Sequence, residues 1–329
     1  MGRDERKIGL KLQGINLLLA VTRCGSMGKA AAELSLSQPA ISKAIGEMES
    51  TLGVRLLDRG ARGVEPTIYG RALLDHGPIA LDELRQAIKR IEFLANPSTG
   101  EVHIGSSVPI ASGFVSAVVE RLARRYRDVV FHLSASESAV AYAALEERKV
   151  DLVVARIFGP LAADHMNAEI LYHEAQMVVA AEQNPWARRR KIELADLMQE
   201  PWILPPPDSL SGLVIDAAFH AVGLERPRTA IVAQTVPVRN ALIASGRFLS
   251  IVPESVLQFP VGDPHLKRLP IDLSMTQRPI AIITLKNRTL NPVAQLFIEG
   301  ARELAASLGQ PPHNATATRL ARGPKRATA

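Results

Sequence analysis

Residues 26–67 read SMGKAAAELSLSQPAISKAIGEMESTLGVRLLDRGARGVEPT. This pattern predicts two short helices around a tight turn, followed by a basic hairpin bracketed by Gly60 and Gly63. The second helix is expected over 38–52, where apolar residues recur at spacings of four, three and four and form one buried stripe. These residues are Ile41, Ile45, Met48 and Leu52. Such a layout offers the opposite face of the helix to the major groove of duplex DNA.

The opposite face of this second helix carries short or polar residues that leave room for base edges: Gln38, Pro39, Ser42, Lys43 and Gly46. Ser37 stands at the N-cap position, and Pro39 is tolerated in the first turn because its missing N–H would have no partner there. A preceding alanine-rich helix over 27–34 is capped by Ser26. An earlier amphipathic helix, with Leu12, Ile15, Leu19 and Thr22 in register, completes a three-helix core.

Residues 25–59, GSMGKAAAELSLSQPAISKAIGEMESTLGVRLLDR, closely resemble the winged helix-turn-helix of LysR-type transcriptional regulators. The resemblance extends from about Leu10 to Leu308, but its specific motifs lie before residue 70. It implies base contacts, phosphate contacts and minor-groove contacts on the helices and the hairpin. The residues it assigns to DNA, with the capping Ser37, are Gln38, Pro39, Ser42 and Lys43 for bases, and Ser26, Lys29, Arg59 and Arg62 for phosphate or the minor groove.

Two departures from the family pattern concern these contacts. The family often has arginine where Lys43 stands, so the sequence gives less support for bidentate guanine readout at this position. The family also usually has proline after the threonine that opens the next helix, whereas Thr67 is followed by Ile68.

The charge of the chain is concentrated at its two ends. The 329 residues carry a net charge of +6, 47% of them are hydrophobic and 4% aromatic. Residues 1–67 hold ten basic and seven acidic residues, whereas residues 97–309 hold 21 and 22. The central body is therefore not a general polyanion binder, and only the N-terminal excess coincides with a DNA-reading motif.

One cysteine, Cys24, excludes an intramolecular disulfide and favours a reducing compartment, with a redox switch as the less favoured alternative. The chain has no apolar run of transmembrane length, and its N-terminus has no cleavage site after an apolar core. We expect no membrane association and a location in the bacterial cytoplasm.

A long helix is expected from Thr67, its N-cap, to about Ala95. Its apolar residues alternate at spacings of three and four, as in a heptad seam: Leu74, Gly77, Leu81, Leu84, Ile88, Ile91 and Ala95. The seam predicts pairing with a second copy of the chain, and the alternative is packing on the chain's own domains. The breaker cluster at 96–100, NPSTG, then predicts a hinge.

From residue 101 strands and helices alternate, which predicts parallel sheets and two α/β lobes with a cleft between them. Strands are expected at 102–106, 129–134, 151–155, 168–173, 176–181, 202–204, 229–233, 248–252 and 279–285. Helices are expected at 109–126, 138–149, 193–199, 209–222, 236–245 and 291–308. The arrangement is similar to the periplasmic-binding-protein-like effector domain of the LysR-type family.

Small-molecule ligands of such sheets bind beyond the carboxyl ends of the strands. The residues expected there are polar groups at helix starts and one strand-terminal guanidinium: Ser106, Ser107, Ser136, Ser138, Arg156, Pro207, Ser209 and Thr235. Hydroxyls and free N–H groups at helix N-termini suit an anionic or polar ligand. Ser138 also matches a serine or threonine that the family often has seven positions before an LxxxxxD run, here Leu145 to Asp151. The alternatives are ordinary helix caps and a hinge ion pair.

No metal-ligand spacing is visible around the histidines His103, His132, His173 and His220, so we expect neither a metal nor a cofactor. The chain also has no P-loop, no GxSxG elbow and no GxGxxG after a strand. An enzyme with a DNA-binding head is therefore disfavoured. A pure solute-binding protein lacks its export signal, and a constitutive architectural DNA binder would leave the cleft unexplained.

The expected organisation is a winged helix-turn-helix at 1–67, a linker and dimerisation helix at 68–96 and a two-lobed effector domain at 97–309. Lobe I is expected at about 100–165 and 270–309, lobe II at about 166–269, and a disordered basic tail at 310–329. The expected function is sequence-specific transcriptional regulation, modulated by a small-molecule effector and without catalytic residues. The expected partners are double-stranded DNA, the effector, a second copy in a homodimer or homotetramer, and RNA polymerase.

Overall fold

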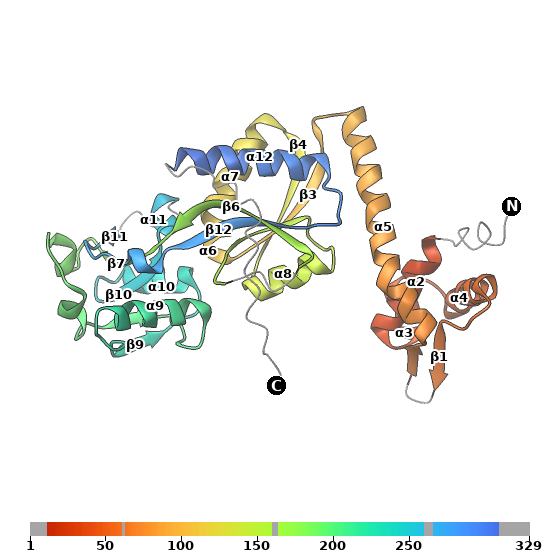
Figure 1. Ribbon diagram of the computed structural model, residues 1–329, viewed down its shortest axis with the longest axis horizontal. Helices are drawn as coiled ribbons and strands as arrows, with labels where there is room; N and C mark the ends of the chain where they lie inside the picture. The colour runs from red at the N-terminus through yellow and green to blue at the C-terminus, as the bar shows by residue number, and fades with distance from the viewer. Residues whose placement is uncertain (1–11, 61–62, 160–163, 260–265, 309–329) are drawn as a thin grey trace, which may run out of the picture. The chain divides into compact units, whose positions relative to one another are not determined.

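The computed structural model of the protein describes residues 12–60, 63–159, 164–259 and 266–308 (Figure 1). The chain divides into two compact units, Met1–Ile88 and Lys89–Ala329. Among the described residues, no helix is both long enough and apolar enough to span a bilayer. The basic tail expected at 310–329 lies outside the described residues.

The first unit is a small helical domain with a two-stranded hairpin. Its elements are α2 (Leu12–Cys24), α3 (Met27–Glu33), α4 (Gln38–Leu52), β1 (Leu57–Gly60), β2 (Gly63–Pro66) and the first part of α5 (Ile68–Ala95). The helix predicted at 38–52 is confirmed at both ends. The core is formed by apolar residues of all three short helices, among them Leu18, Val21, Ala30, Ile41 and Ile45. A three-helix core is present as predicted, but the predicted register of the first helix is wrong. Helix α2 enters the core through Leu17, Leu18 and Val21, whereas Leu12 is exposed and Leu19 and Thr22 are half-buried.

Two glycines allow close approaches in this unit. A Cβ atom on Gly14 would overlap the sulfur of Met48, so α2 lies directly against the Met48 side chain of α4 at this position. Gly63 has a φ of +121° and its Cβ would lie 2.7 Å from the carbonyl oxygen of Gly25. That oxygen accepts a hydrogen bond from the Val64 N–H at 3.0 Å. The hairpin is thereby fixed against the turn that precedes α3.

The second unit contains two five-stranded sheets. The first has the order β4-β3-β5-β12-β6, in which β3 is parallel to β4 and β5, and β12 is antiparallel to β5 and β6. Its strands are β3 (Thr99–Ser106), β4 (Asp128–Ala135), β5 (Leu152–Arg156), β6 (Met166–Glu174) and β12 (Arg278–Leu285). Helices α6 (Val108–Ile110), α7 (Ser116–Arg125), α8 (Ser138–Glu146) and α12 (Pro292–Ser307) accompany it, and a π-helical segment, Ala111–Val115, joins α6 to α7.

Alternate residues of β5 enter two different cores, as strand pleating requires. Leu152 and Val154 pack with Phe114 and Phe297 on the side of α7 and α12. Val153 and Ala155 pack with residues of α8 on the other face (Figure 1). This sheet is therefore covered by helices on both sides.

The second sheet has the order β11-β7-β10-β8-β9 and is also covered on both faces. Its strands are β7 (Gln176–Ala181), β8 (Trp202–Leu204), β9 (Thr229–Val232), β10 (Leu249–Pro253) and β11 (Leu266–Arg268). Its helices are α9 (Leu210–Ala221), α10 (Val236–Ile243) and α11 (Ser255–Gln258), with 3₁₀ turns at Pro185–Arg188, Leu194–Leu197 and Ser274–Thr276. The helix predicted at 193–199 is thus only a short 3₁₀ turn.

The boundary between the lobes lies later than the predicted residue 166. Strand β6 belongs to the first sheet because it pairs along its whole length with the returning β12. The chain then crosses to the second sheet through Ala175 and comes back before β12, and the two crossings are joined by a 2.8 Å hydrogen bond from the Gln176 N–H to the Thr276 hydroxyl. Lobe I is therefore 99–174 and 278–307, and lobe II is 176–273.

Candidate functional site

Helix α4 separates its side chains as the apolar pattern predicted. Ile41, Ile45 and Met48 are buried, and Leu52 is half-buried. Gln38, Pro39 and Lys43 are exposed on the opposite face, and Ser42 beside them is half-buried. The predicted base-reading residues therefore share one accessible surface of this helix.

The predicted phosphate-contacting residues frame α4. The Ser37 hydroxyl accepts a hydrogen bond from the Ala40 N–H at 3.3 Å, and the Ser26 hydroxyl accepts one from the Lys29 N–H at 3.5 Å. Both serines are N-caps, and Lys29 is exposed one turn further on. Arg59 on β1 donates to the Ser42 hydroxyl at 3.4 Å, which places the hairpin guanidinium beside α4. Arg62 lies outside the described residues.

Cys24, the single cysteine, has surroundings that disfavour the thiolate. Its thiol donates to the Glu33 carboxylate at 3.2 Å, and this hydrogen bond is the main cause that raises the pKa of Cys24. Because oxidation proceeds through the thiolate, this contact argues against a redox switch.

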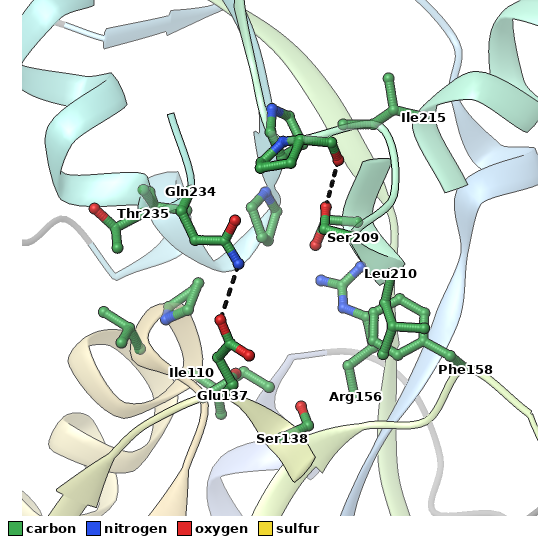
Figure 2. Close-up of a pocket in the computed structure, with 18 of the residues that line it drawn as sticks. Ile110, Glu137, Ser138, Arg156, Phe158, Ser209, Leu210, Ile215, Gln234 and Thr235 are labelled. Carbon is green, nitrogen blue, oxygen red and sulfur yellow. Dashed lines mark hydrogen bonds between the residues drawn. The ribbon is translucent and has the colours of Figure 1, made fainter. Parts of the chain in front are cut away.

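A cavity of about 730 Å³ lies between the two lobes of the second unit (Figure 2). Its wall contains the starts of four helical segments, two from each lobe: residues 107–110, 136–139, 208–211 and 234–236. The N–H groups at helix starts carry partial positive charge, which favours an anionic ligand. Apolar residues such as Ile110, Phe158 and Ile251 complete the wall. The cavity size is typical of small-molecule sites.

Six predicted effector-contacting residues line this cavity, namely Ser107, Ser136, Ser138, Arg156, Ser209 and Thr235. Ser106 and Pro207 do not line it. Ser106 is buried within the sheet, and its hydroxyl donates to the Val154 carbonyl at 2.7 Å. Pro207 is exposed and its neighbours Pro206 and Asp208 form the wall instead. The Ser209 hydroxyl caps α9 by accepting from the Gly212 N–H at 3.1 Å.

Arg156, at the end of β5, forms a buried ion pair. Its Nη2 contacts the Glu174 carboxylate, and the two side chains are 7% and 1% exposed. The Ser255 N–H donates to the other oxygen of Glu174 at 2.6 Å. The pair joins β5 to the last residue before the crossing into lobe II. Arg156 therefore acts first as a hinge ion pair, although its guanidinium also reaches the cavity (Figure 2).

Arg239, which sequence reasoning missed, is the most unusual residue in the cavity wall. It lies on α10 and is only 3% exposed. Its Nε and Nη1 atoms have no hydrogen-bond partner. Burial lowers the pKa of Arg239 from its ordinary value to about 10, because the guanidinium has lost its hydration without gaining a counter-charge. No sequence signal identified it, because one arginine in a helix usually lies on the solvated face.

One side-chain hydrogen bond crosses the cavity from lobe to lobe. The Gln234 amide of lobe II donates to the Glu137 carboxylate, at the start of α8 in lobe I, at 3.0 Å (Figure 2). Both residues line the cavity. A ligand between the lobes would lie beside this contact.

Two family models match the chain. One, described as a bacterial regulatory helix-turn-helix protein of the lysR family, matches residues 12–71. The other, described as the LysR substrate binding domain, matches residues 95–306, more than half of the chain. The chain belongs to the LysR-type transcriptional regulators. The regulator is therefore a DNA-binding transcription factor with an effector-binding domain and is not an enzyme, as the sequence predicted.

Curated relatives of the regulator match it over most of their length. GbpR of Azospirillum brasilense, an HTH-type transcriptional regulator, is 29% identical over 90% of this chain and 87% of its own. PcaQ of Agrobacterium fabrum is 26% identical over 93% and 97%. Each is named as an HTH-type regulator, in agreement with the family of this chain.

Solved structures of LysR-type proteins share the fold of the regulator. A full-length OxyR variant from Pseudomonas aeruginosa superposes with a TM-score of 0.62 at 15% identity, over 89% of this chain and 94% of its own. Full-length CbnR in complex with its target DNA gives a TM-score of 0.53 at 23% identity, over 90% and 99%. The predicted fold, a helix-turn-helix followed by two α/β lobes, is thereby confirmed.

Proposed function

We propose that a small carboxylate binds between the two lobes and modulates how the regulator binds DNA or activates promoters. The observation that carries this proposal is Arg239, a buried guanidinium with unpartnered nitrogen atoms in the wall of a cavity. An ionised group in such a place requires a counter-charge, and a carboxylate supplies two acceptor oxygens in a geometry that fits a guanidinium.

The rest of the cavity supports an anion with a hydrocarbon body. Ser107 and Thr235 are N-caps whose hydroxyls make no cap hydrogen bond, so both remain available to a ligand. Arg156 is already neutralised by Glu174, which leaves Arg239 as the uncompensated cation among the described residues of the wall. The acidic residues of the wall, Glu137 and Asp208, are in contact with solvent and therefore screened by water.

A ligand in this position contacts both lobes at once, and we propose that this is how it modulates DNA binding or promoter activation. Ser107 and Ser138 belong to lobe I, whereas Ser209, Thr235 and Arg239 belong to lobe II. A ligand that bridges them favours the lobe arrangement in which both sets of contacts form. The hydrogen bond between Gln234 and Glu137 is specific to one such arrangement, so the ligand shifts its population.

DNA is read by the exposed face of α4, with the hairpin arginines on the backbone. We assign base readout to Gln38, Pro39, Ser42 and Lys43, and phosphate or minor-groove contact to Ser26, Lys29, Ser37, Arg59 and Arg62. An amide such as that of Gln38 suits the two polar atoms of an adenine edge. The N-terminal excess of positive charge supports this placement.

The C-terminal half of α5 supports self-association. Leu84, Ile88, Ile91 and Ala95 are exposed and lie at spacings of four, three and four, whereas Gly77 and Leu81 are buried. A Cβ on Gly77 would lie 2.6 Å from Ile15 of α2, so the N-terminal half of the predicted seam packs within its own unit. We therefore assign residues 1–67 to DNA reading, 68–96 to a linker that pairs copies into a homodimer or homotetramer, and 97–309 to the effector. The site of action is the bacterial cytoplasm, with RNA polymerase as a partner at the promoter.

The test measures ligand affinity calorimetrically for the full chain. The panel pairs aliphatic and aromatic monocarboxylates with the amide of each acid, which has the same shape without the charge. The expected result is that carboxylates bind, amides bind at least tenfold more weakly, and Arg239→Gln loses the difference. Arg247→Gln, an exposed arginine of the same lobe, is the matched control. Equal affinity for acid and amide would refute an anionic effector.

A further inference from the structure

Three potential metal ligands meet on one face of the first sheet, away from the interlobe cavity. His103 on β3 lies directly opposite His132 on β4 in the parallel register. Glu101 lies two residues before His103, so its side chain is on the same face of the strand. The two imidazole rings stack with centroids 4.1 Å apart and planes within 2°. The pairing of β3 with β4 therefore brings these three residues together, although they show no metal-ligand spacing in the sequence.

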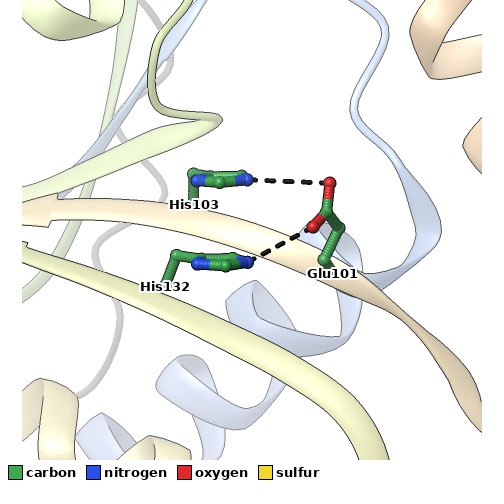
Figure 3. A group of neighbouring side chains, drawn as sticks. All are labelled: Glu101, His103 and His132. Carbon is green, nitrogen blue, oxygen red and sulfur yellow. Dashed lines mark hydrogen bonds and ion pairs between the residues drawn. The ribbon is translucent and has the colours of Figure 1, made fainter.

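The ligand atoms of the cluster have separations that suit one metal ion (Figure 3). The His132 Nε2 lies 3.2 Å from one Glu101 oxygen, and the His103 Nε2 lies 3.7 Å from the other. The ligand atoms of all three residues lie within 4.8 Å of one another, and in the described part of the chain this is the one such group of histidine, cysteine or acidic residues. Ligands at about 2.0–2.1 Å from a tetrahedral zinc ion are about 3.3 Å apart, between these two distances.

We propose that Glu101, His103 and His132 form a binding site for a divalent transition-metal ion, and that Zn²⁺ is the best match. Two imidazole nitrogens and one carboxylate oxygen are ligands that zinc accepts, whereas Mg²⁺ and Ca²⁺ prefer oxygen alone. The side chains are 36–45% exposed, so an ion can enter and water can occupy the remaining coordination position.

The charge of the cluster suits a divalent cation. Imidazole binds a metal ion as a neutral ligand, so the carboxylate must supply the negative charge of the site. One Glu101 carboxylate facing both Nε2 atoms brings the negative charge that a divalent cation requires.

The ion would compete with one residue of the linker helix. Lys89, near the C-terminal end of α5, places its Nζ 3.2 Å from the Glu101 oxygen that also faces His103. A cation bound to this carboxylate repels the lysine ammonium, so metal binding and the Lys89 contact exclude each other. Occupation of the site would remove this ion pair between α5 and β3.

The experiment titrates the full chain, without an affinity tag, with ZnCl₂ in a calorimeter. We expect one high-affinity site, and an at least tenfold weaker affinity in His103→Gln, His132→Gln and Glu101→Gln. His165→Gln is the matched control, because His165 forms a surface pair with Glu146 at 3.3 Å that offers only two ligands. MgCl₂ should produce no comparable binding. Replacement of zinc by Co²⁺ should give the strong visible absorption of a tetrahedral site.

Lys89→Gln separates ligation from folding, because its expected effect is a gain. Without the competing ammonium, the affinity for Zn²⁺ should rise several-fold, while a variant that merely damages the sheet would lose affinity. If Lys89→Gln binds Zn²⁺ with the same affinity as the wild type, Lys89 does not compete with the metal ion for Glu101. Zinc binding that survives in the His103→Gln, His132→Gln double variant, or no zinc binding by the wild type, would overturn the site itself.

Discussion

Replacement of Arg239 by methionine should stabilise lobe II and abolish its response to carboxylates. Each tenfold change in proton affinity corresponds to about 1.4 kcal/mol, so the fall in the pKa of Arg239 from its ordinary value to about 10 reflects a burial penalty of about 3 kcal/mol. Methionine keeps the apolar stem and removes the charge. We expect Arg239→Met to raise the free energy of unfolding by about 1–3 kcal/mol.

The sign of the effect with pH follows from the depressed pKa. Below pH 10 the guanidinium is charged in both folded and unfolded chains, so the penalty is fully present. Above about pH 10 the folded chain releases this proton before the unfolded chain does, so the burial penalty decreases as the pH rises. The stability difference between variant and wild type should therefore be constant from about pH 6 to 9 and should narrow only above about pH 10.

Tryptophan fluorescence in a denaturant titration measures the stability difference between Arg239→Met and the wild type, and it reports on the unfolding of lobe II. Both tryptophans of the chain, Trp186 and Trp202, belong to lobe II, which also contains Arg239. A carboxylate at about one hundred times its dissociation constant should stabilise the wild type by about 2.7 kcal/mol and leave Arg239→Met unchanged. The exposed Arg247→Met is the control and should change stability by less than about 0.5 kcal/mol. If Arg239→Met is less stable than the wild type, or gains equally from the carboxylate, the reasoning is refuted.

Three further predictions concern DNA reading, self-association and the hairpin. Gln38→Ala should relax sequence choice, whereas Arg62→Ala should weaken binding to all DNA and lower the salt slope by about one, in titrations with operator and random duplexes; equal losses on both duplexes for Gln38→Ala would contradict base readout. Ile91→Lys, on the exposed apolar stripe of α5, should weaken self-association at least tenfold in sedimentation, with Glu92→Lys, off that stripe, as the unaffected control. Gly63→Ala should destabilise the DNA-binding unit by about 1–3 kcal/mol in thermal circular dichroism, because the φ of Gly63 is +121°. Gly60→Ala is the control and should leave the stability unchanged, because a Cβ on Gly60 would meet nothing within 4 Å. Equal destabilisation by both variants would exclude backbone strain at Gly63 as the cause.

Local sequence patterns predicted the helices and strands well because their signals are local. Ser37 and Pro39 mark the start of α4, and Asn291, whose side chain accepts from the Ala294 N–H at 2.8 Å, marks that of α12. The sheet to which a strand belongs is a long-range property. Strand β6 was therefore misplaced, because its partner β12 lies more than a hundred residues further along the chain.

The site could be predicted only in part, for the same physical reason. Polar residues at helix starts after strands are visible in the sequence, which predicted Ser107, Ser138 and Thr235, and all three line the cavity. The burial of a side chain within a helix depends on what packs over it, and Arg239 therefore gave no signal. Ser106 was wrongly included, because only the fold shows that its hydroxyl donates to a neighbouring strand. His103 and His132 meet through register across two strands, a relation no spacing rule detects.

Strand β12 occupies an inner position of the first sheet, between β5 and β6. As the ribosome makes the chain, lobe II leaves the exit tunnel complete while lobe I still lacks this strand. During that interval the edges of β5 and β6 expose unpaired backbone groups, which invite contacts with other nascent chains. The order of translation therefore lets lobe II fold before lobe I. The first sheet can be completed only after residue 285 has left the ribosome.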